Sequence, residues 1–189
     1  NGVCTPSASD VTIRLDQAPT VSNAGTPQTV CGTATTLNGN APTIGTGQWS
    51  FAPGGNPDAL GSIADINSRV SGFTGTAGIT YTLRWTISNG VCPVSTSDVT
   101  IQFDQAPTVS NAGANQNVCG TSTALTGNTP TVGTGLWTIV SGAGGSFVLN
   151  TNPTTTFNGT AGVTYVLRWT ISNGVCTPSA SDVTIRLDQ

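Results

Sequence analysis

The chain begins and ends with the same seventeen residues. Asn1 to Gln17 reads NGVCTPSASDVTIRLDQ and recurs letter for letter from Asn173 to Gln189. Two shorter segments return inside the chain: DQAPTVSNAG from Asp16 to Gly25 recurs 88 residues later, and SNGVC from Ser88 to Cys92 recurs 84 residues later. Self-similarity at a nearly fixed period is the signature of a repeat array. The sequence therefore predicts a modular chain built from repeats of 84 to 88 residues.

The positions of the recurrences divide the chain into three parts. We expect residues 1–17 to be the last strand of a preceding repeat, 18–105 to be the first whole repeat and 106–189 the second. Each repeat has the size of a small sandwich domain, about 100 residues. The repeats differ in length at one place, because the segment from Trp49 to Phe73 is four residues longer than its counterpart from Trp137 to Phe157. Length variation of this kind is typical of a surface loop.

The local pattern is that of β-strands throughout. From Tyr81 to Ile87, large apolar residues alternate with Thr and Arg, and the same pattern recurs from Tyr165 to Ile171. Alternation with period two and many aromatic and β-branched residues indicates half-buried strands. No segment has a helical period, and Gly, Pro and Asn punctuate the apolar runs. We therefore expect an all-β fold, two tandem antiparallel β-sandwich domains plus an N-terminal extra strand.

A hairpin signal, Ser88-Asn89-Gly90, separates two strands of the first repeat. The residues expected to face inward have odd numbers in both strands. A two-residue turn would place the odd-numbered residues of the second strand on the opposite face from those of the first. We expect a longer loop or a bulge between Val91 and Val94, where Pro93 also interrupts strand pairing.

The large aromatic residues lie at inward positions of the expected strands. This parity indicates core packing rather than a sugar-stacking surface. The expected core residues are Trp49, Tyr81, Trp85, Trp137, Tyr165 and Trp169.

Composition excludes several classes of function. Only 7% of the residues are charged, the net charge is −3, and the chain contains neither His nor Lys. Without His or Lys, Ser-His-Asp, Cys-His and Ser-Lys arrangements are impossible, so we expect no enzyme. The absence of a basic cluster argues against nucleic acid binding. No apolar run approaches the ~20 residues of a membrane-spanning helix, and nothing in the sequence indicates a cofactor.

The charged residues suggest structural roles. Arg84 and Asp98, like Arg168 and Asp182, point outward from neighbouring strands, and we expect cross-strand ion pairs rather than a ligand site. The carboxylates expected at the domain joints are those of Asp16, Asp104 and Asp188. One carboxylate per joint falls short of the six to eight oxygen ligands that calcium prefers, so no metal site is predicted.

The residues also carry a resemblance to a known family. APTVSNAG, QTVCGT, GTGQW, FTGTAGITYTLRWTISNGVC and SDVTI cover nearly the whole chain twice. This pattern resembles the immunoglobulin-like and PKD-like repeats of very large secreted surface proteins of Bacteroidetes-type bacteria. The resemblance implies sandwich domains, export to the cell surface, an adhesin or stalk role and no catalytic residues.

The five cysteines occur in two contexts, VCG at Cys31 and Cys119 and NGVC at Cys4, Cys92 and Cys176. Neither context has the clustered ligands of a zinc site, so disulfides in an oxidising compartment are expected. One candidate pairing lies within each repeat: Cys31 with Cys92, and Cys119 with Cys176.

Strand direction favours a different pairing. If the strands follow immunoglobulin order, the turn after Cys31 closes the first pair of strands at the pole where the domain ends. The hairpin that carries Cys92 then lies at the opposite pole. A strand of about eight residues spans ~26 Å, whereas the Cα atoms of a disulfide lie within about 7 Å. In a head-to-tail stack Cys31 reaches Cys176 of the next domain. We favour this inter-domain disulfide, and the local pairing returns if the topology differs. Cys4, Cys92 and Cys119 would then find partners outside these residues.

Two functions fit these observations. The first is a structural repeat segment of an extracellular surface protein, a stalk or filament shaft with disulfide-stapled joints. The alternative is an adhesive module that recognises glycans or surfaces through its outer strand faces or the loop between Trp49 and Phe73. Sandwich domains expose edge strands, and edges with so little charge favour pairing with neighbours, so we also expect self-association along an array or filament.

Overall fold

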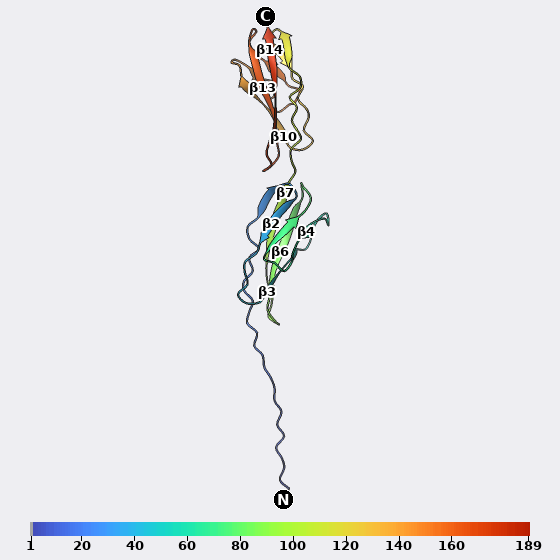
Figure 1. The fold of residues 1–189 in the computed structure, drawn as a ribbon, viewed down its shortest axis with the longest axis vertical. Coiled ribbons are helices and arrows are strands. Elements are labelled where there is room, and N and C mark those ends of the chain that lie inside the picture. Colours follow the sequence, from blue (N-terminus) through green and yellow to red (C-terminus); the bar gives the residue numbers. More distant parts are fainter. Residues whose placement is uncertain (1) are drawn as a thin grey trace.

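The computed structural model describes residues 2–189, in which two β-sandwich domains lie end to end along one long axis (Figure 1). These residues contain seven strands in each domain and no helix. The first domain comprises β1 (Gln28–Cys31), β2 (Ala34–Asn38), β3 (Thr46–Phe51), β4 (Ser62–Ile63), β5 (Val70–Thr74), β6 (Thr80–Ser88) and β7 (Ser95–Asp104). The second comprises β8 (Gln116–Cys119), β9 (Ser122–Ala124), β10 (Thr134–Ser141), β11 (Ser146–Phe147), β12 (Thr156–Asn158), β13 (Thr164–Ser172) and β14 (Ser179–Asp188).

Each domain consists of a four-stranded and a three-stranded sheet. In the first domain the sheets have the orders β1-β7-β6-β3 and β2-β5-β4, and the second domain repeats them as β8-β14-β13-β10 and β9-β12-β11. Adjacent strands are antiparallel, except that β1 runs parallel to β7 and β8 runs parallel to β14. The predicted fold, two tandem sandwiches of mainly antiparallel strands, is confirmed.

One detail of the predicted topology is wrong. The turn after Cys31 was expected to close a pair of strands, but β1 and β2 belong to different sheets. The turn at Gly32 carries the chain from one sheet to the other. Cys31 nevertheless lies at the pole where the domain ends, because β1 runs parallel to β7 and Cys31 pairs with Asp104, the last residue of β7.

The hairpin between β6 and β7 has the long loop that side-chain parity predicts. Ile87 pairs with Ser95, which leaves residues 89–94 as the loop, and Ile171 pairs with Ser179 in the second domain. This register keeps the apolar residues of both strands on one face. The prediction of a loop longer than two residues is confirmed.

Each domain has its own apolar core between its two sheets. All six predicted core aromatics are at most 1% exposed. The indole of Trp49 on β3 packs against that of Trp85 on β6 with 4.9 Å between ring centroids, and the equivalent pair, Trp137 and Trp169, lies at 5.0 Å. Immunoglobulin domains often place a disulfide between the sheets, with a cysteine two residues after a corner tyrosine. Leu83, fully buried, stands two residues after Tyr81, so an apolar side chain takes the place of that cysteine here.

The corner tyrosine anchors a different loop in each domain. The backbone amide of Thr76 donates to the hydroxyl of Tyr81 over 2.8 Å, and this hydroxyl donates to the carboxylate of Asp58 at 2.8 and 2.9 Å. In the second domain, where the loop is shorter, the hydroxyl of Tyr165 donates to the carbonyl oxygen of Ala143 over 2.8 Å. The side chain of Asp58 therefore fastens the longer loop of the first repeat to the fold.

We expect Tyr81→Phe and Tyr165→Phe each to destabilise their domain by about 1 kcal/mol, because a partly buried amide loses its acceptor. Only Tyr81→Phe also releases the loop at Asp58, whose carboxylate accepts from the amide of Leu60 over 3.1 Å. Amide hydrogen exchange should therefore accelerate at Leu60 and Gly61 in Tyr81→Phe. Unchanged exchange at these amides would show that the hydroxyl does not hold the loop.

Residues 2–17 leave the first domain as an extended segment along the long axis, away from the second domain (Figure 1). The segment pairs with no strand among the described residues. Its last residues, Asp16 and Gln17, contact the hairpin between β6 and β7. The first domain proper begins after these contacts: the amide of Thr20 donates to the carbonyl oxygen of Ile44 over 3.1 Å.

Candidate functional site

The candidate functional site is the junction of the two domains, where a disulfide and hydrogen bonds link them. Its first half is the pole of the first domain, where β1 and β7 end side by side. The backbone amide of Gly32 donates to the carbonyl oxygen of Asp104 over 2.9 Å and holds the two strand ends together. Cys31 and Asp104 therefore present a sulfur atom and a carboxylate from neighbouring strands.

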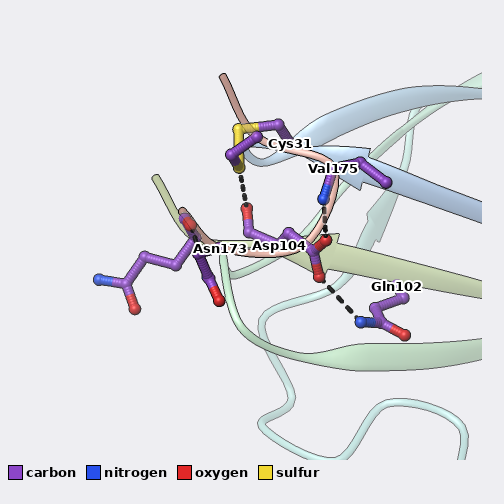
Figure 2. The surroundings of a disulfide bond; sticks show 7 residues. Cys31, Gln102, Asp104, Asn173 and Val175 are labelled. Atoms are coloured by element: carbon purple, nitrogen blue, oxygen red, sulfur yellow. Dashed lines mark hydrogen bonds between the residues drawn. A yellow bond between two sulfur atoms is a disulfide. The ribbon is translucent and has the colours of Figure 1, made fainter. Parts of the chain in front are cut away.

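The second half is the hairpin between β13 and β14. A turn bond from the amide of Cys176 to the carbonyl oxygen of Asn173, 3.1 Å long, shapes its tip. A disulfide joins Cys31 to Cys176 with 4.9 Å between Cα atoms and 145 residues of intervening sequence. Figure 2 shows this bond between the end of β1 and the hairpin of the following domain. The disulfide is the inter-domain pairing that strand direction favours.

Hydrogen bonds around Asp104 reinforce the covalent link. The side-chain amide of Asn173 donates to the carbonyl oxygen of Gln105 over 2.7 Å, and the backbone amide of Val175 donates to the Asp104 carboxylate over 2.9 Å. The side-chain amide of Gln102 donates to the other oxygen of the Asp104 carboxylate over 2.8 Å (Figure 2). Asp104 is 8% exposed, and both of its carboxylate oxygens have a donor.

Gly174 permits the close approach of the hairpin to this carboxylate. Its φ of 50° lies in the left-handed region, which L side chains rarely adopt. A Cβ at this position would also overlap the carboxylate of Asp104. The sequence Asn-Gly at the hairpin tip therefore serves the junction as well as the turn.

The same contacts recur where the N-terminal segment meets the first domain. The side-chain amide of Asn89 donates to the carbonyl oxygen of Gln17 over 2.8 Å, and the amide of Val91 lies 3.3 Å from the carboxylate of Asp16. The thiol of Cys92 lies 3.4 Å from the carbonyl oxygen of Asp16, where Cys176 lies 3.6 Å from that of Asp104. This half-junction reproduces the contacts of the hairpin with the preceding residues but has no disulfide, and Arg14, 2.7 Å from the Asp16 carboxylate, takes the place of Gln102.

The remaining cysteines are unpaired. Cys4 and Cys119 are exposed and Cys92 is half-buried. The local pairings of Cys31 with Cys92 and Cys119 with Cys176 are not formed, because the two members of each pair lie at opposite poles of their domain. Cys119 ends β8 beside Asp188 just as Cys31 ends β1 beside Asp104. The pole at Cys119 and Asp188 therefore repeats the half of the junction that β1 and β7 supply.

Both cross-strand ion pairs lie on the solvent face of their domains. The guanidinium of Arg84 binds the carboxylate of Asp98 through two hydrogen bonds of 2.7 and 2.8 Å, and Arg168 binds Asp182 through two of 2.7 and 2.9 Å. The hydrogen bonds from each arginine lower the pKa of its carboxyl partner below the ordinary value. These residues link neighbouring strands of each sheet.

The lowered pKa values give these pairs a defined pH dependence. A carboxyl group whose pKa is lower in the folded state stabilises the fold above its unfolded pKa of about 3.9 and loses that contribution as the pH falls through the folded value. Because both aspartates are 39% exposed, each pair contributes only about 0.2–1 kcal/mol. We expect Asp98→Asn and Asp182→Asn to lose this amount at pH 7 and to match the wild type at pH 2 in denaturant titrations. A larger loss at pH 2 than at pH 7 would contradict the assignment.

The loop of the first repeat adds an acidic group without forming a metal site. The hydroxyl of Thr76, followed by the amide of Leu60 and the hydroxyl of Tyr81, lowers the pKa of Asp58. No group of three or more His, Cys, Asp or Glu side chains suited to a metal ion occurs within residues 2–189. Asp16 and Asp104 accept hydrogen bonds at the junctions.

Within residues 2–189 no helix is long and apolar enough to span a membrane.

Sequence reasoning identified the cysteines but missed three partners at the junction: Gln102, Asp104 as an acceptor, and Asn173. A usable signal was present, because the dipeptides Asp-Gln and Asn-Gly recur at every expected junction. The preference of Asn-Gly for turns already accounts for its presence in the hairpin. Only the structure shows that the side chain of Asn173 donates a hydrogen bond to the preceding domain.

Comparison with known proteins supports the fold. No model of a protein family matches the chain, and no curated protein matches it in sequence. Among solved structures, extracellular domains 3–5 of Drosophila OTK are similar with a TM-score of 0.62 and 12% identity, over 87% of this chain and 60% of that one. Immunoglobulin domains 1–4 of Sidekick-1 give a TM-score of 0.60 and 10% identity, over 95% of this chain and 51% of that one. A PKD domain from the KIAA 1837 protein gives 0.38 and 24%, over 44% and 85%.

The likenesses to the OTK and Sidekick-1 domains define the class of the chain by its fold. It is a tandem of immunoglobulin-like β-sandwich domains. The chain spans less than two thirds of the OTK and Sidekick-1 structures that it matches.

Proposed function

We propose that the chain is a non-catalytic structural segment of an extracellular surface protein, a stalk or filament shaft whose domain joints are stapled by disulfides. The observation that carries the proposal is the junction: a disulfide, two inter-domain hydrogen bonds and a buried carboxylate hold one domain on the next. A binding module needs no such covalent hold between its domains, whereas a shaft that projects a tip away from the cell does.

The N-terminal segment supports the proposal that the chain is part of an array of repeats. Residues 2–17 have the sequence of the last hairpin and strand of a repeat, and Asp16 and Gln17 already contact the first domain in the way that Asp104 and Gln105 contact the second. We propose that this segment belongs to a preceding repeat. Disulfides are typical of oxidising compartments, which supports an extracellular location, and the Bacteroidetes-type resemblance of the sequence supports a bacterial surface. Self-association along an array is part of the same proposal.

Small-angle X-ray scattering of the whole chain tests the shaft. The oxidised protein should give an extended particle with little inter-domain motion. Reduction with dithiothreitol should broaden the distance distribution, because the hydrogen bonds alone hold the junction less tightly. Identical profiles in both states would contradict a shaft stiffened by its disulfides.

A second candidate function rests on one hollow in the first domain. It is open, about 580 Å³ in volume, and lined by Pro42, Gln48, Asn67 and Ser88 among others. Asn67 belongs to the longer loop, and the amide of Gln48 donates to it over 3.3 Å. The second repeat has Leu136 in place of Gln48, so the amide-lined hollow is particular to the first. Amide groups suit sugar hydroxyls, and a glycan array probed with the whole chain and with Gln48→Leu tests adhesive binding there.

A further inference from the structure

We infer that a pulling force passes through the two domains along one short covalent line: residues 18–31, the disulfide from Cys31 to Cys176, and residues 176–189. Most of each domain lies off this line, within the loop that the disulfide closes. The disulfide therefore shields the folded domains from tension. This inference deepens the shaft proposed above and rests on it, because a shaft that projects a tip from a surface is loaded along its length.

The first part of the line is already extended in the folded domain. The backbone amide of Ser22 donates to the hydroxyl of Ser95, at the start of β7, over 2.9 Å. Cys31 pairs with Asp104 at the end of β7. Residues 22–31 therefore cover with ten residues the distance that β7 also covers with ten. A strand is close to the limit of about 3.3–3.6 Å per residue, so pulling can lengthen this segment only slightly.

The second part of the line is β14. Cys176 lies three residues before Ser179, where this strand of ten residues begins, and the strand ends at Asp188, at the far pole of the second domain. The disulfide joins the two parts with 4.9 Å between Cα atoms. Because the domains lie end to end on one axis (Figure 1), the line runs along the whole tandem and has little slack.

The strand arrangement shows what the disulfide prevents. Residues 28–31 of β1 pair in parallel with residues 101–104 of β7. Without the disulfide, tension would draw β1 by its first residue and β7 by its last, in opposite directions. The two strands would slide past each other, and the first domain would unfold. The disulfide fixes the distance between Cys31 and Cys176, so the loop between them, which contains β7, cannot be stretched.

The line sets how far the chain can extend. With the disulfide intact, only residues 1–31 and 176–189 can be drawn out, which gives a contour length of at most about 160 Å. With the disulfide broken, all 189 residues can be drawn out, to about 660 Å. The difference of about 500 Å corresponds to the sequence separation of 145 between the two cysteines.

Optical tweezers that hold the whole chain by its two ends test the inference. The wild type without reductant should reach its full extension with no domain-unfolding step, and the variant Cys31→Ser/Cys176→Ser should unfold both domains and gain about 500 Å of contour length. The matched variant Cys92→Ser/Cys119→Ser keeps the disulfide and should behave as the wild type. Dithiothreitol, added while the wild type is held under force, should convert it to the behaviour of the first variant. Domain unfolding in the wild type without reductant would overturn the inference.

A substitution off the line separates a bypass of the domains from general stiffening. Gly47 lies on β3, where a Cβ would overlap the indole of Trp85. In the chain with Cys31→Ser/Cys176→Ser, Gly47→Ala should raise the rate of first-domain unfolding at constant force several-fold, because the unfolding barrier sets this rate. In the chain with its disulfide, the same substitution should leave the force–extension curve unchanged. An altered curve there would show that the first domain bears load, against the inference.

The line of force and the shaft fail in different experiments. Identical scattering profiles of the oxidised and reduced chains contradict the shaft but leave the covalent line in place. Domain unfolding of the oxidised chain under load contradicts the line, whatever the scattering profiles show.

Discussion

Replacing both joint cysteines, Cys31→Ser with Cys176→Ser, is expected to destabilise both domains by about 2–4 kcal/mol. Cys31 belongs to the first domain and Cys176 to the second, so the disulfide and the peptide link between the domains together close a loop. When either domain unfolds, its part of this loop stays anchored at both ends to the folded domain. Loop closure reduces the entropy of the unfolded chain and so favours folding. For domains of this size each kcal/mol shifts the midpoint of thermal unfolding by about 4–8 °C. Calorimetry should therefore show a decrease of about 10 °C or more.

The chain supplies its own control for this experiment. Cys92 and Cys119 occupy the same NGVC and VCG contexts as Cys176 and Cys31 but are unpaired. The variant Cys92→Ser/Cys119→Ser should change stability by no more than about 0.5 kcal/mol, as most surface substitutions do. Equal losses in the two double variants would show that cysteine replacement, rather than the lost disulfide, causes the effect.

Adding one methyl group opposite a buried tryptophan is the other change with a large expected effect. Gly47 on β3 faces the indole of Trp85, and a Cβ at this position would overlap the ring. The indole has little room to move away, because it is 1% exposed and a Cβ at Gly39 would also lie only 2.9 Å from it. We expect Gly47→Ala to destabilise the first domain by about 1–3 kcal/mol, the usual effect of overpacking a closed core. Urea unfolding followed by tryptophan fluorescence measures the change.

Gly72→Ala is the matched control. Gly72 is also a strand glycine of the first domain, but a Cβ there would meet only the methyl group of Ala64 at an ordinary 3.6 Å. Its replacement should be neutral or stabilise by about 0.4–1 kcal/mol, because alanine has less conformational freedom in the unfolded chain. If both variants are destabilised equally, the intrinsic loss of glycine rather than the indole contact is responsible.

Side-chain alternation was sufficient to predict the sandwich fold. Period-two patterns placed Tyr81, Trp85 and their equivalents in the core, and the parity of the inward residues predicted a long hairpin loop. These features follow from local rules, because a strand buried on one face must alternate and a hairpin must keep its apolar residues on that face.

Pairing between distant strands could not be read from local patterns. The parallel contact of β1 with β7 joins residues far apart in the sequence, and nothing in QTVC indicates which sheet it joins. The role of Asp58 depends equally on tertiary structure, since only the fold brings its carboxylate to the hydroxyl of Tyr81. The junction was predicted only in part. Strand direction favoured the pairing of Cys31 with Cys176, whereas only the structure shows the contacts of Asn173 and Gln102.

A disulfide map of the oxidised wild-type chain tests the stapled junction most directly. The five arginines divide the chain so that Cys31 falls in tryptic peptide 15–69, Cys92 and Cys119 in 85–168, and Cys176 in 169–186. After free thiols are alkylated and the protein is unfolded and digested without reduction, mass spectrometry should find peptide 15–69 linked to peptide 169–186. Peptide 15–69 linked instead to peptide 85–168 would show that Cys31 pairs with Cys92 or Cys119 and would contradict the junction.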